Sequence, residues 1–229
     1  MKVSIIIPCF NEEKTIEKII EKVLNLKDIN LEIIVIDDGS SDLSKDILEK
    51  KLKNKINILI LNEKNYGKGY SIRKGIKVAT GDVLIIQDAD LEYDPSDYYK
   101  LIKPFKEGFA DVVYGSRFIG TEEKRVLYFW HTLGNKILTF LSNIFTNLNL
   151  TDMEVCYKAF KAEVIKEIDL EENRFGFEPE ITAKIAKKNL RIYEVGVKYF
   201  GRKYIEGKKI TWKDGFSALR CILKYNLLK

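Results

Sequence analysis

Short runs of aliphatic residues recur along the first half of the chain, and each run ends abruptly at polar or acidic residues. Runs of this length that are apolar at every position are typical of strands buried on both faces of a parallel sheet. Pro8 is expected to end the first strand, because proline has no N–H to donate to a neighbouring strand. Repetition of strand, helix and strand at this spacing predicts an α/β fold with a single doubly wound, mostly parallel sheet flanked by helices. The expected strands cover residues 3–7, 31–36, 56–61, 83–86 and 111–115, and the helices between them cover residues 15–26, 43–53, 70–79 and 95–106.

Acidic residues follow three of these strands: Glu12, the pair Asp37 and Asp38, and the pair Asp88 and Asp90. Ligands of doubly wound sheets bind outside the carboxyl ends of the strands, so we expect these acids to face one site. Asp88 and Asp90 are two residues apart, and in an extended chain both side chains point the same way. Two carboxylates suit Mg²⁺ or Mn²⁺, which takes its other ligands from water and substrate phosphates. A solvated turn ahead of a helix is the alternative for this stretch.

Two basic loops are candidates for contact with an anion. Residues 62–69 hold Lys68 between two glycines, which either bring backbone amides and the ammonium to an anion or simply form a turn before a helix. Residues 199–209 either form a solvated loop or close as a clamp over the site. The basic residues of this second loop are Arg202, Lys203, Lys208 and Lys209.

Composition narrows the classes of protein. A chain of 229 residues with 45% hydrophobic content can bury a full core as one domain. The net charge of +5 is spread along the chain, which suits an anionic substrate or a membrane surface and gives no nucleic-acid signature. Cys9, Cys156 and Cys221 are far apart in apolar settings, so we expect reduced thiols and no thiolate zinc site. The single histidine, His131, excludes mechanisms that need two histidines.

The second half of the chain has a different character. Residues 126–150 combine large apolar side chains with polar interruptions and predict one or two amphipathic helices, which either complete the core, lie in a bilayer interface or serve self-association. A helix is expected over residues 178–188, a strand over 191–197 and a last helix capped by Thr211. No uncharged window reaches the roughly 20 residues of a membrane span, and the N-terminus has no signal-peptide pattern. We therefore expect a cytoplasmic protein, free or peripheral on the cytoplasmic face of a membrane.

Five short motifs occur in a fixed order along residues 3–118. Together they resemble the family 2 glycosyltransferases of the GT-A fold, and within that family the dolichyl-phosphate and polyprenyl-phosphate mannose and glucose synthases. The likeness continues through residues 151–158, 177–180 and 207–210. The five motifs are Ile-Ile-Pro-Cys-Phe-Asn-Glu (6–12), Asp-Asp-Gly-Ser-Ser-Asp (37–42), Asn-Tyr-Gly-Lys-Gly (65–69), Gln-Asp-Ala-Asp (87–90) and Gly-Ser-Arg-Phe (115–118).

The resemblance implies one GT-A domain over residues 1–229. Residues 1–120 would bind the nucleotide sugar, and residues 121–229, with helices suited to a membrane interface, would bind the acceptor. Asp88 and Asp90 would hold Mg²⁺ or Mn²⁺ on the donor diphosphate, and Arg117 and Arg202 would meet phosphate groups, for which guanidinium is well shaped. Pro8, Phe10, Glu12 and Asp37 would line the nucleoside pocket with Asp38 in support. The complete set of predicted site residues is Pro8, Phe10, Glu12, Asp37, Asp38, Lys68, Asp88, Asp90, Arg117, Asp152 and Arg202.

The implied reaction is metal-dependent, inverting transfer of a hexose from GDP-mannose or a UDP-sugar to a polyprenyl or dolichyl phosphate. A phosphomonoester has a second pKa of about 6 and is mostly a dianion at neutral pH, so it needs no strong general base. An acceptor hydroxyl would need one, and Asp152 or Glu154 would supply it. The alternatives are a soluble family 2 transferase acting on a saccharide or protein, and a non-catalytic nucleotide-binding module. Two departures from the family are the missing C-terminal membrane helices and Cys-Tyr-Lys at residues 156–158 in place of Gly-Phe-Arg.

Overall fold

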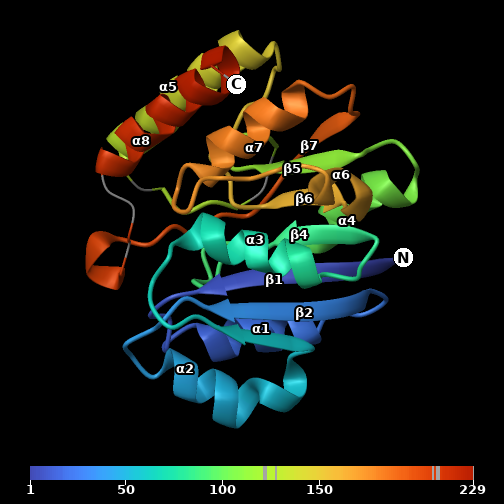
Figure 1. The fold of residues 1–229 in the computed structure, drawn as a ribbon, viewed down its shortest axis with the longest axis vertical. Coiled ribbons are helices and arrows are strands. Elements are labelled where there is room, and N and C mark those ends of the chain that lie inside the picture. The colour runs from blue at the N-terminus through green and yellow to red at the C-terminus, as the bar shows by residue number, and fades with distance from the viewer. Residues whose placement is uncertain (121–122, 127, 208, 210–211, 229) are drawn as a thin grey trace.

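The computed structural model describes residues 1–120, 123–126, 128–207, 209 and 212–228. A seven-stranded sheet crosses the molecule in the order β3-β2-β1-β4-β6-β5-β7, with helices covering it (Figure 1). The strands are β1 (Lys2–Cys9), β2 (Asn30–Asp37), β3 (Ile58–Leu61), β4 (Val83–Ile86), β5 (Val112–Ser116), β6 (Lys158–Lys161) and β7 (Ile192–Gly196).

The helices occupy the segments between the strands and the C-terminal part of the chain. Shorter π-helical or 3-10 turns lie at Ile47–Leu52, Lys53–Lys55, Pro95–Asp97, Tyr204–Glu206 and Lys224–Leu228. The helices are α1 (Ile16–Leu24), α2 (Ser44–Asp46), α3 (Lys68–Val78), α4 (Tyr98–Lys106), α5 (Phe129–Thr146), α6 (Ala162–Lys166), α7 (Phe177–Ala186) and α8 (Trp212–Leu223).

The predicted mostly parallel sheet is confirmed, with one strand that the sequence did not indicate. β6 runs antiparallel between β4 and β5, whereas the other neighbouring strands in the sheet are parallel. The sequence of β6 is Lys-Ala-Phe-Lys, too short and too charged to show a strand pattern. Its first residue, Lys158, is nevertheless fully buried, so tertiary packing and not local preference places this strand.

The prediction that Pro8 ends the first strand is wrong, because β1 continues through Cys9. Pro8 pairs with Ile36 of β2, and β4 pairs with β1 only as far as Ile6. The carbonyl of Ile6 faces β4, where it accepts from the N–H of Gln87. Since successive residues of a strand face alternate sides, the nitrogen of Pro8 also faces the β4 side, beyond the last pair, and no ladder bond is lost.

Most of the other expected boundaries differ by one to three residues. β3 begins at Ile58 and not at residue 56. The helix expected over residues 43–53 contains three α-helical residues and continues as π-helical and 3-10 turns, in which Leu48 and Leu52 are still fully buried. α3 begins at Lys68 and not at residue 70, after Gly67 with a φ of +107°. A Cβ at this glycine would lie 2.3 Å from the carbonyl oxygen of Asn173, so the position requires glycine.

α5, α7 and α8 pack against one another above the sheet, and α5 and α8 lie side by side at one end of the molecule (Figure 1). The expectation of an amphipathic helix within residues 126–150 is confirmed by α5, but its buried residues are the polar Thr139 and Ser142. Large apolar side chains of α5 and α8 face solvent, so α5 does not simply complete the core. Within the described residues, no helix has both the length and the apolar content required to cross a bilayer. Thr211, the expected cap of α8, lies outside the described residues.

Candidate active site

The carboxyl ends of β2, β1 and β4 are neighbours in the sheet, and the acids predicted from the sequence follow these ends. Cys9 at the end of β1 pairs with Asp37 at the end of β2. Glu12, after β1, and Asp90, after β4, both accept hydrogen bonds from the guanidinium of Arg202. The structure therefore brings acids that are far apart in sequence to one rim of the sheet.

Asp37 and Asp38 lie side by side but differ in what they contact. Asp37 is fully buried, and its Oδ2 accepts from the N–H of Ser40 at 3.1 Å, while its Oδ1 has no hydrogen-bond partner among the described residues. Asp38 accepts from the backbone N–H groups of Tyr66 and Gly67, at 3.1 and 2.7 Å. Asp38 thus holds the loop before α3, whereas Asp37 offers a buried carboxylate oxygen to a donor such as a ribose hydroxyl or a base N–H.

Pro8 and Phe10 are half-buried at the end of β1, beside this pair of acids. The ammonium of Lys209 donates to Oε1 of Glu12 at 2.7 Å and to the carbonyl oxygen of Phe10. It also lies 5.7 Å from the centre of the Phe10 ring. Lys209 therefore ties the C-terminal basic loop to the first strand, and Lys208, another basic residue of that loop, lies outside the described residues.

Asp88 lies in a line of ion pairs that the sequence did not predict. Its Oδ1 is 2.8 Å from Nζ of Lys68, which is also 3.1 Å from Oε1 of Glu178 in the first turn of α7. Burial opposes ionisation of Asp88, but the Lys68 ammonium outweighs it and keeps the pKa of Asp88 below its usual range. Lys68, predicted to approach an anion, does so here with two carboxylates.

Asp90 is one of several acids that surround the guanidinium of Arg202. Its Oδ2 accepts from Nη2 of Arg202 at 2.8 Å, and Arg202 also donates to both oxygens of Glu12, at 3.1 and 3.2 Å. Burial, followed by repulsion from Asp88 and Glu92, raises the pKa of Asp90 to about 7 despite Arg202. Glu92 was missed by sequence reasoning, although it continues the two-residue spacing of Asp88 and Asp90.

This rim fits a divalent cation. Hard carboxylate oxygens suit Mg²⁺ and Mn²⁺, and Asp88 and Asp90 offer two carboxylates here, with Glu12 and Glu92 around the same guanidinium. Among the described residues, no cluster of three or more His, Cys, Asp or Glu could hold a metal ion unaided. A metal ion here would therefore take some of its ligands from outside the protein, as a diphosphate provides.

Arg117 and Asp152, both predicted site residues, are bonded to each other. Arg117 donates from Nε and Nη2 to the two oxygens of Asp152, at 2.7 and 2.6 Å, and its backbone N–H donates to the same carboxylate at 3.0 Å. Asp152 is fully buried, and its own N–H is held by Glu194. Arg117 also lies over the ring of Tyr199, 5.2 Å from its centre. Both carboxylate oxygens of Asp152, a predicted general base, thus accept hydrogen bonds from Arg117, which was predicted to bind phosphate.

A second group of titratable residues lies between this pair and Asp88. Glu154 Oε1 and Glu178 Oε2 are buried with no hydrogen-bond partner among the described residues. Burial, and then repulsion from Glu178, raises the pKa of Glu154 to about 8. Burial lowers the pKa of Lys158, which is completely enclosed on β6. Glu178 and Lys158 received no role from the sequence, because nothing in the pattern indicated that α7 brings Glu178 to Lys68 or that the antiparallel β6 pairs with β4.

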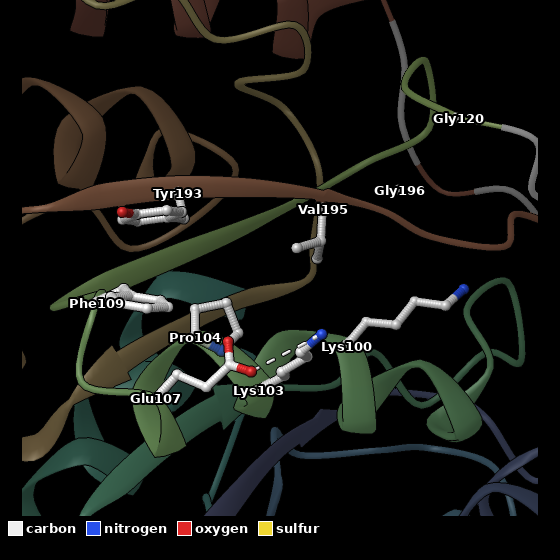
Figure 2. Close-up of a pocket in the computed structure, with 9 residues that line it drawn as sticks. All are labelled: Lys100, Lys103, Pro104, Glu107, Phe109, Gly120, Tyr193, Val195 and Gly196. Atoms are coloured by element: carbon white, nitrogen blue, oxygen red, sulfur yellow. Dashed lines mark ion pairs between the residues drawn. The ribbon is translucent and has the colours of Figure 1, made fainter.

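A cavity of about 480 Å³ lies apart from this rim, between α4 and β7 (Figure 2). Pro104, Phe109 and Tyr193 contribute apolar surface, and Lys103 at its edge lies 3.8 Å from Glu107. None of the predicted site residues lines it. The cavity is therefore not part of the candidate active site.

Comparison with known proteins places this geometry in a family. The sequence profile of glycosyl transferase family 2 matches residues 4–169. An uncharacterized protein of Methanocaldococcus jannaschii is 34% identical over 225 residues, which cover 90% of this chain and 93% of that protein. The dolichol-phosphate mannosyltransferase of Pyrococcus furiosus is 30% identical over 237 residues, but these cover 64% of its length and 100% of this chain. The undecaprenyl-phosphate 4-deoxy-4-formamido-L-arabinose transferase of Photorhabdus laumondii is 29% identical over 99% of this chain and 67% of its own length.

Solved structures show the same architecture. Glucosyl-3-phosphoglycerate synthase from Mycobacterium tuberculosis, in complex with Mn²⁺, UDP and phosphoglyceric acid, superposes with a TM-score of 0.78 at 17% identity, over 100% of this chain and 79% of that one. The same enzyme with Mn²⁺ and UDP-glucose gives a TM-score of 0.77 over 98% of this chain and 79% of that chain. The expected fold and family are confirmed: the chain has the GT-A fold and belongs to glycosyltransferase family 2.

Proposed function

We propose that this glycosyltransferase moves a hexose from GDP-mannose or a UDP-sugar to a polyprenyl or dolichyl phosphate, with inversion at the anomeric carbon. The observation that carries the proposal is the contact of one guanidinium, that of Arg202, with Glu12 after β1 and Asp90 after β4. This contact joins the predicted nucleoside and metal positions in one site. Two of the relatives are named for transfer of sugars to polyprenyl phosphates, which supports the choice of acceptor.

The nucleoside would lie against β1 and β2. There the unpartnered Oδ1 of Asp37 accepts a hydrogen bond from base or ribose, and the half-buried Phe10 and Pro8 supply apolar contact. Asp38 keeps the loop before α3 in place through Gly67, so the pocket wall is fixed before the donor arrives. A carboxylate accepts from the N–H groups of guanine and of uracil alike, so the proposal includes both GDP-mannose and UDP-sugars.

The diphosphate would lie beyond the nucleoside, at the end of β4. Asp88 and Asp90 would hold Mg²⁺ or Mn²⁺ there, and the metal would supply Lewis-acid stabilisation of the departing nucleoside diphosphate. Solved structures of the same fold contain Mn²⁺ with UDP or UDP-glucose, which supports metal use. Lys68, held against Asp88, and Arg202 are two cations of this chain that can meet the phosphates.

The acceptor would approach from the second half of the chain. Arg117 is oriented by Asp152 and by the ring of Tyr199, and it is the guanidinium we assign to the acceptor phosphate. A phosphate dianion attacks without losing a proton, so the engaged oxygens of Asp152 are no obstacle to this reaction. The exposed apolar side chains of α5 and α8, including Trp130, Phe140, Trp212 and Phe216, would rest in the membrane interface that contains the lipid.

The decisive experiment supplies the purified protein with Mn²⁺, a radiolabelled sugar nucleotide and a short-chain polyprenyl phosphate in detergent. Transfer predicts label in the organic phase after solvent extraction, dependent on the acceptor and abolished by EDTA. A parallel thermal-shift screen with GDP, UDP and their sugars identifies the donor base, because the bound nucleotide stabilises the folded state. Release of nucleoside diphosphate without lipid label, in the presence of a saccharide that becomes labelled, would contradict the lipid acceptor.

A hydroxyl acceptor is the second candidate, and Glu154 is the observation that favours it. Its Oε1 is buried without a partner, and its raised pKa of about 8 makes it a carboxyl that exchanges a proton near neutral pH. Acting as a base, it would be active only when ionised, so the transfer rate would rise with pH up to about 8. Glu154→Gln would remove that rise with a hydroxyl acceptor and leave transfer to a phosphate acceptor largely intact.

A further inference from the structure

The segment that follows β7 returns to the rim and is fastened there by Glu92. The N–H of Arg202 donates to Oε1 of Glu92 at 2.8 Å, and the hydroxyl of Tyr199 donates to Oε2 at 3.0 Å. The N–H of Phe200 donates to the backbone carbonyl of Glu92 at 2.8 Å. The chain from Tyr199 to Arg202 is therefore held against Glu92, and this fixes the point from which the Arg202 side chain reaches the acids.

The guanidinium of Arg202 does not neutralise all of the negative charge of the carboxylates around it. One positive charge faces the carboxylates of Glu12, Asp90 and Glu92, and the ammonium of Lys209 adds a second at Glu12. The guanidinium Nε is buried without a hydrogen-bond partner among the described residues, 3.6 Å from Oε1 of Glu92. The side chains of Arg202 and Asp90 are each only 16% exposed, so water compensates little of the remaining charge.

A divalent cation at Asp90 and this guanidinium compete for the same oxygen. Arg202 Nη2 lies 2.8 Å from Oδ2 of Asp90, and a metal ion bound to that oxygen would be repelled by a guanidinium at such short range. A bound diphosphate would shift this competition in favour of the metal ion, because it offers the guanidinium a bidentate acceptor at least as favourable as the carboxylates. Movement of Arg202 from carboxylate to phosphate would free Asp90 for the metal ion.

We propose that Arg202 acts as an internal cation that competes with the divalent metal ion for Asp90, so that the metal binds well only together with the nucleotide diphosphate. The inference rests on the proposed function insofar as Asp90 is a metal ligand. It adds that metal and nucleotide are coupled through one side chain. Coupling of this kind is reciprocal, so the metal ion must tighten nucleotide binding by the same factor.

The test measures binding of Mn²⁺ itself and does not require turnover. Free Mn²⁺ is followed by electron paramagnetic resonance during titration of the wild-type protein, Arg202→Met and Arg202→Lys, with and without saturating UDP or GDP. We expect Arg202→Met to bind Mn²⁺ alone about 5- to 100-fold more tightly than the wild type, and to gain much less from the nucleotide. Arg202→Lys, which keeps the charge without the planar fork, should fall between them.

Lys50→Met is the control for loss of a positive charge. Lys50 pairs with Asp46 on its own helical turn and is exposed, so its removal should leave Mn²⁺ affinity unchanged. Thermal unfolding with and without Mn²⁺ checks that each variant is folded. The inference is overturned if Arg202→Met binds Mn²⁺ alone no more tightly than the wild type while nucleotide still tightens binding, a result that leaves the proposed metal-dependent reaction standing. Absence of Mn²⁺ binding in every protein, even with nucleotide, would overturn both.

Discussion

Arg117 at the end of β5 forms a two-pronged ion pair with Asp152, a residue 35 positions later that precedes β6, with N···O distances of 2.7 and 2.6 Å. The Asp152 side chain is fully buried and that of Arg117 is 11% exposed. Loss of the carboxylate would leave a nearly buried guanidinium without its counter-charge, and such losses cost about 3–5 kcal/mol. We therefore expect Asp152→Asn to lower the free energy of unfolding, measured with urea, by a few kcal/mol.

The double variant Arg117→Met, Asp152→Leu separates the loss of the pair from the loss of one partner. Replacing both groups by apolar side chains leaves no isolated charge, so this protein should be more stable than Asp152→Asn. It should nevertheless transfer no sugar to a phosphate acceptor, because Arg117 is assigned to that phosphate. Equal stability of Asp152→Asn and the double variant would show that leaving the Arg117 guanidinium without its counter-charge does not destabilise the folded protein.

Asp88→Asn and Asp90→Asn test the assignment of the metal ion. Each removes a negative charge where we place the cation, and transfer should fall by about 10²–10³-fold or more. Folding should be retained, since Lys68 keeps Glu178 and Arg202 keeps Glu12 as partners. Asp169→Asn, at an exposed residue before α7, is the matched control and should transfer sugar at the wild-type rate. Full Mn²⁺-dependent activity in both rim variants would refute the assignment.

Stability at low pH should depend on Glu32, which lies near the amino end of β2, at the opposite end of the strands from the site. Burial alone would raise its pKa, but hydrogen bonds from Lys2, Ser4 and Thr80 outweigh burial and lower the pKa to about 2 from its usual 4.5. Because the folded pKa is depressed, the contribution is complete above pH 4.5 and is lost as pH falls towards 2. With Glu32 only 4% exposed, the linkage amounts to about 3 kcal/mol.

Glu32→Gln should therefore destabilise the protein at neutral pH and flatten the decline in stability between pH 4.5 and 2. Urea unfolding at several pH values measures both effects. The variant Glu163→Gln, which changes a largely exposed glutamate on α6, should follow the wild-type curve. A wild-type decline that persists unchanged in Glu32→Gln would assign the acid sensitivity to other carboxylates.

The first half of the fold could be predicted because local pattern and tertiary environment agree there. Each strand of the β3-β2-β1-β4 half is mostly aliphatic and is followed by polar or acidic residues, so the acids of the rim could be placed from strand ends alone. The strand limits were less secure, because Pro8 is tolerated only through its position relative to β4, which local sequence does not contain.

The second half could not be predicted as well because its contacts are non-local. β6 is a strand only because β4 and β5 flank it, and its buried Lys158 has no strand preference. The pair of Arg117 with Asp152 and the placement of Glu178 beside Lys68 likewise join residues that are far apart in sequence. Sequence reasoning could name residues for the site, but not which of them neutralise one another.

The apolar face of α5 and α8 leads to a prediction about membranes. Phe140 on α5 is 63% exposed and Phe216 on α8 is 67% exposed, although burial of each side chain in an apolar phase is worth about 1.5–3 kcal/mol. We expect the protein to float with anionic liposomes. The substitutions Phe140→Ser and Phe216→Ser should each weaken binding about 10- to 100-fold, since each removes close to this free energy.

Phe109→Ser is the matched control, because Phe109 is also an exposed phenylalanine, at 54%, but lines the cavity beside β7, to which α5 and α8 contribute no residue. It should float like the wild type. Transfer to a short-chain acceptor in detergent should survive all three substitutions, since none of these residues contacts the rim, whereas transfer to a long-chain acceptor in liposomes should fall in step with flotation. If Phe140→Ser and Phe216→Ser instead convert a dimer into a monomer in light scattering and leave flotation unchanged, the two helices join copies of the chain, and the lipid must reach Arg117 by another face.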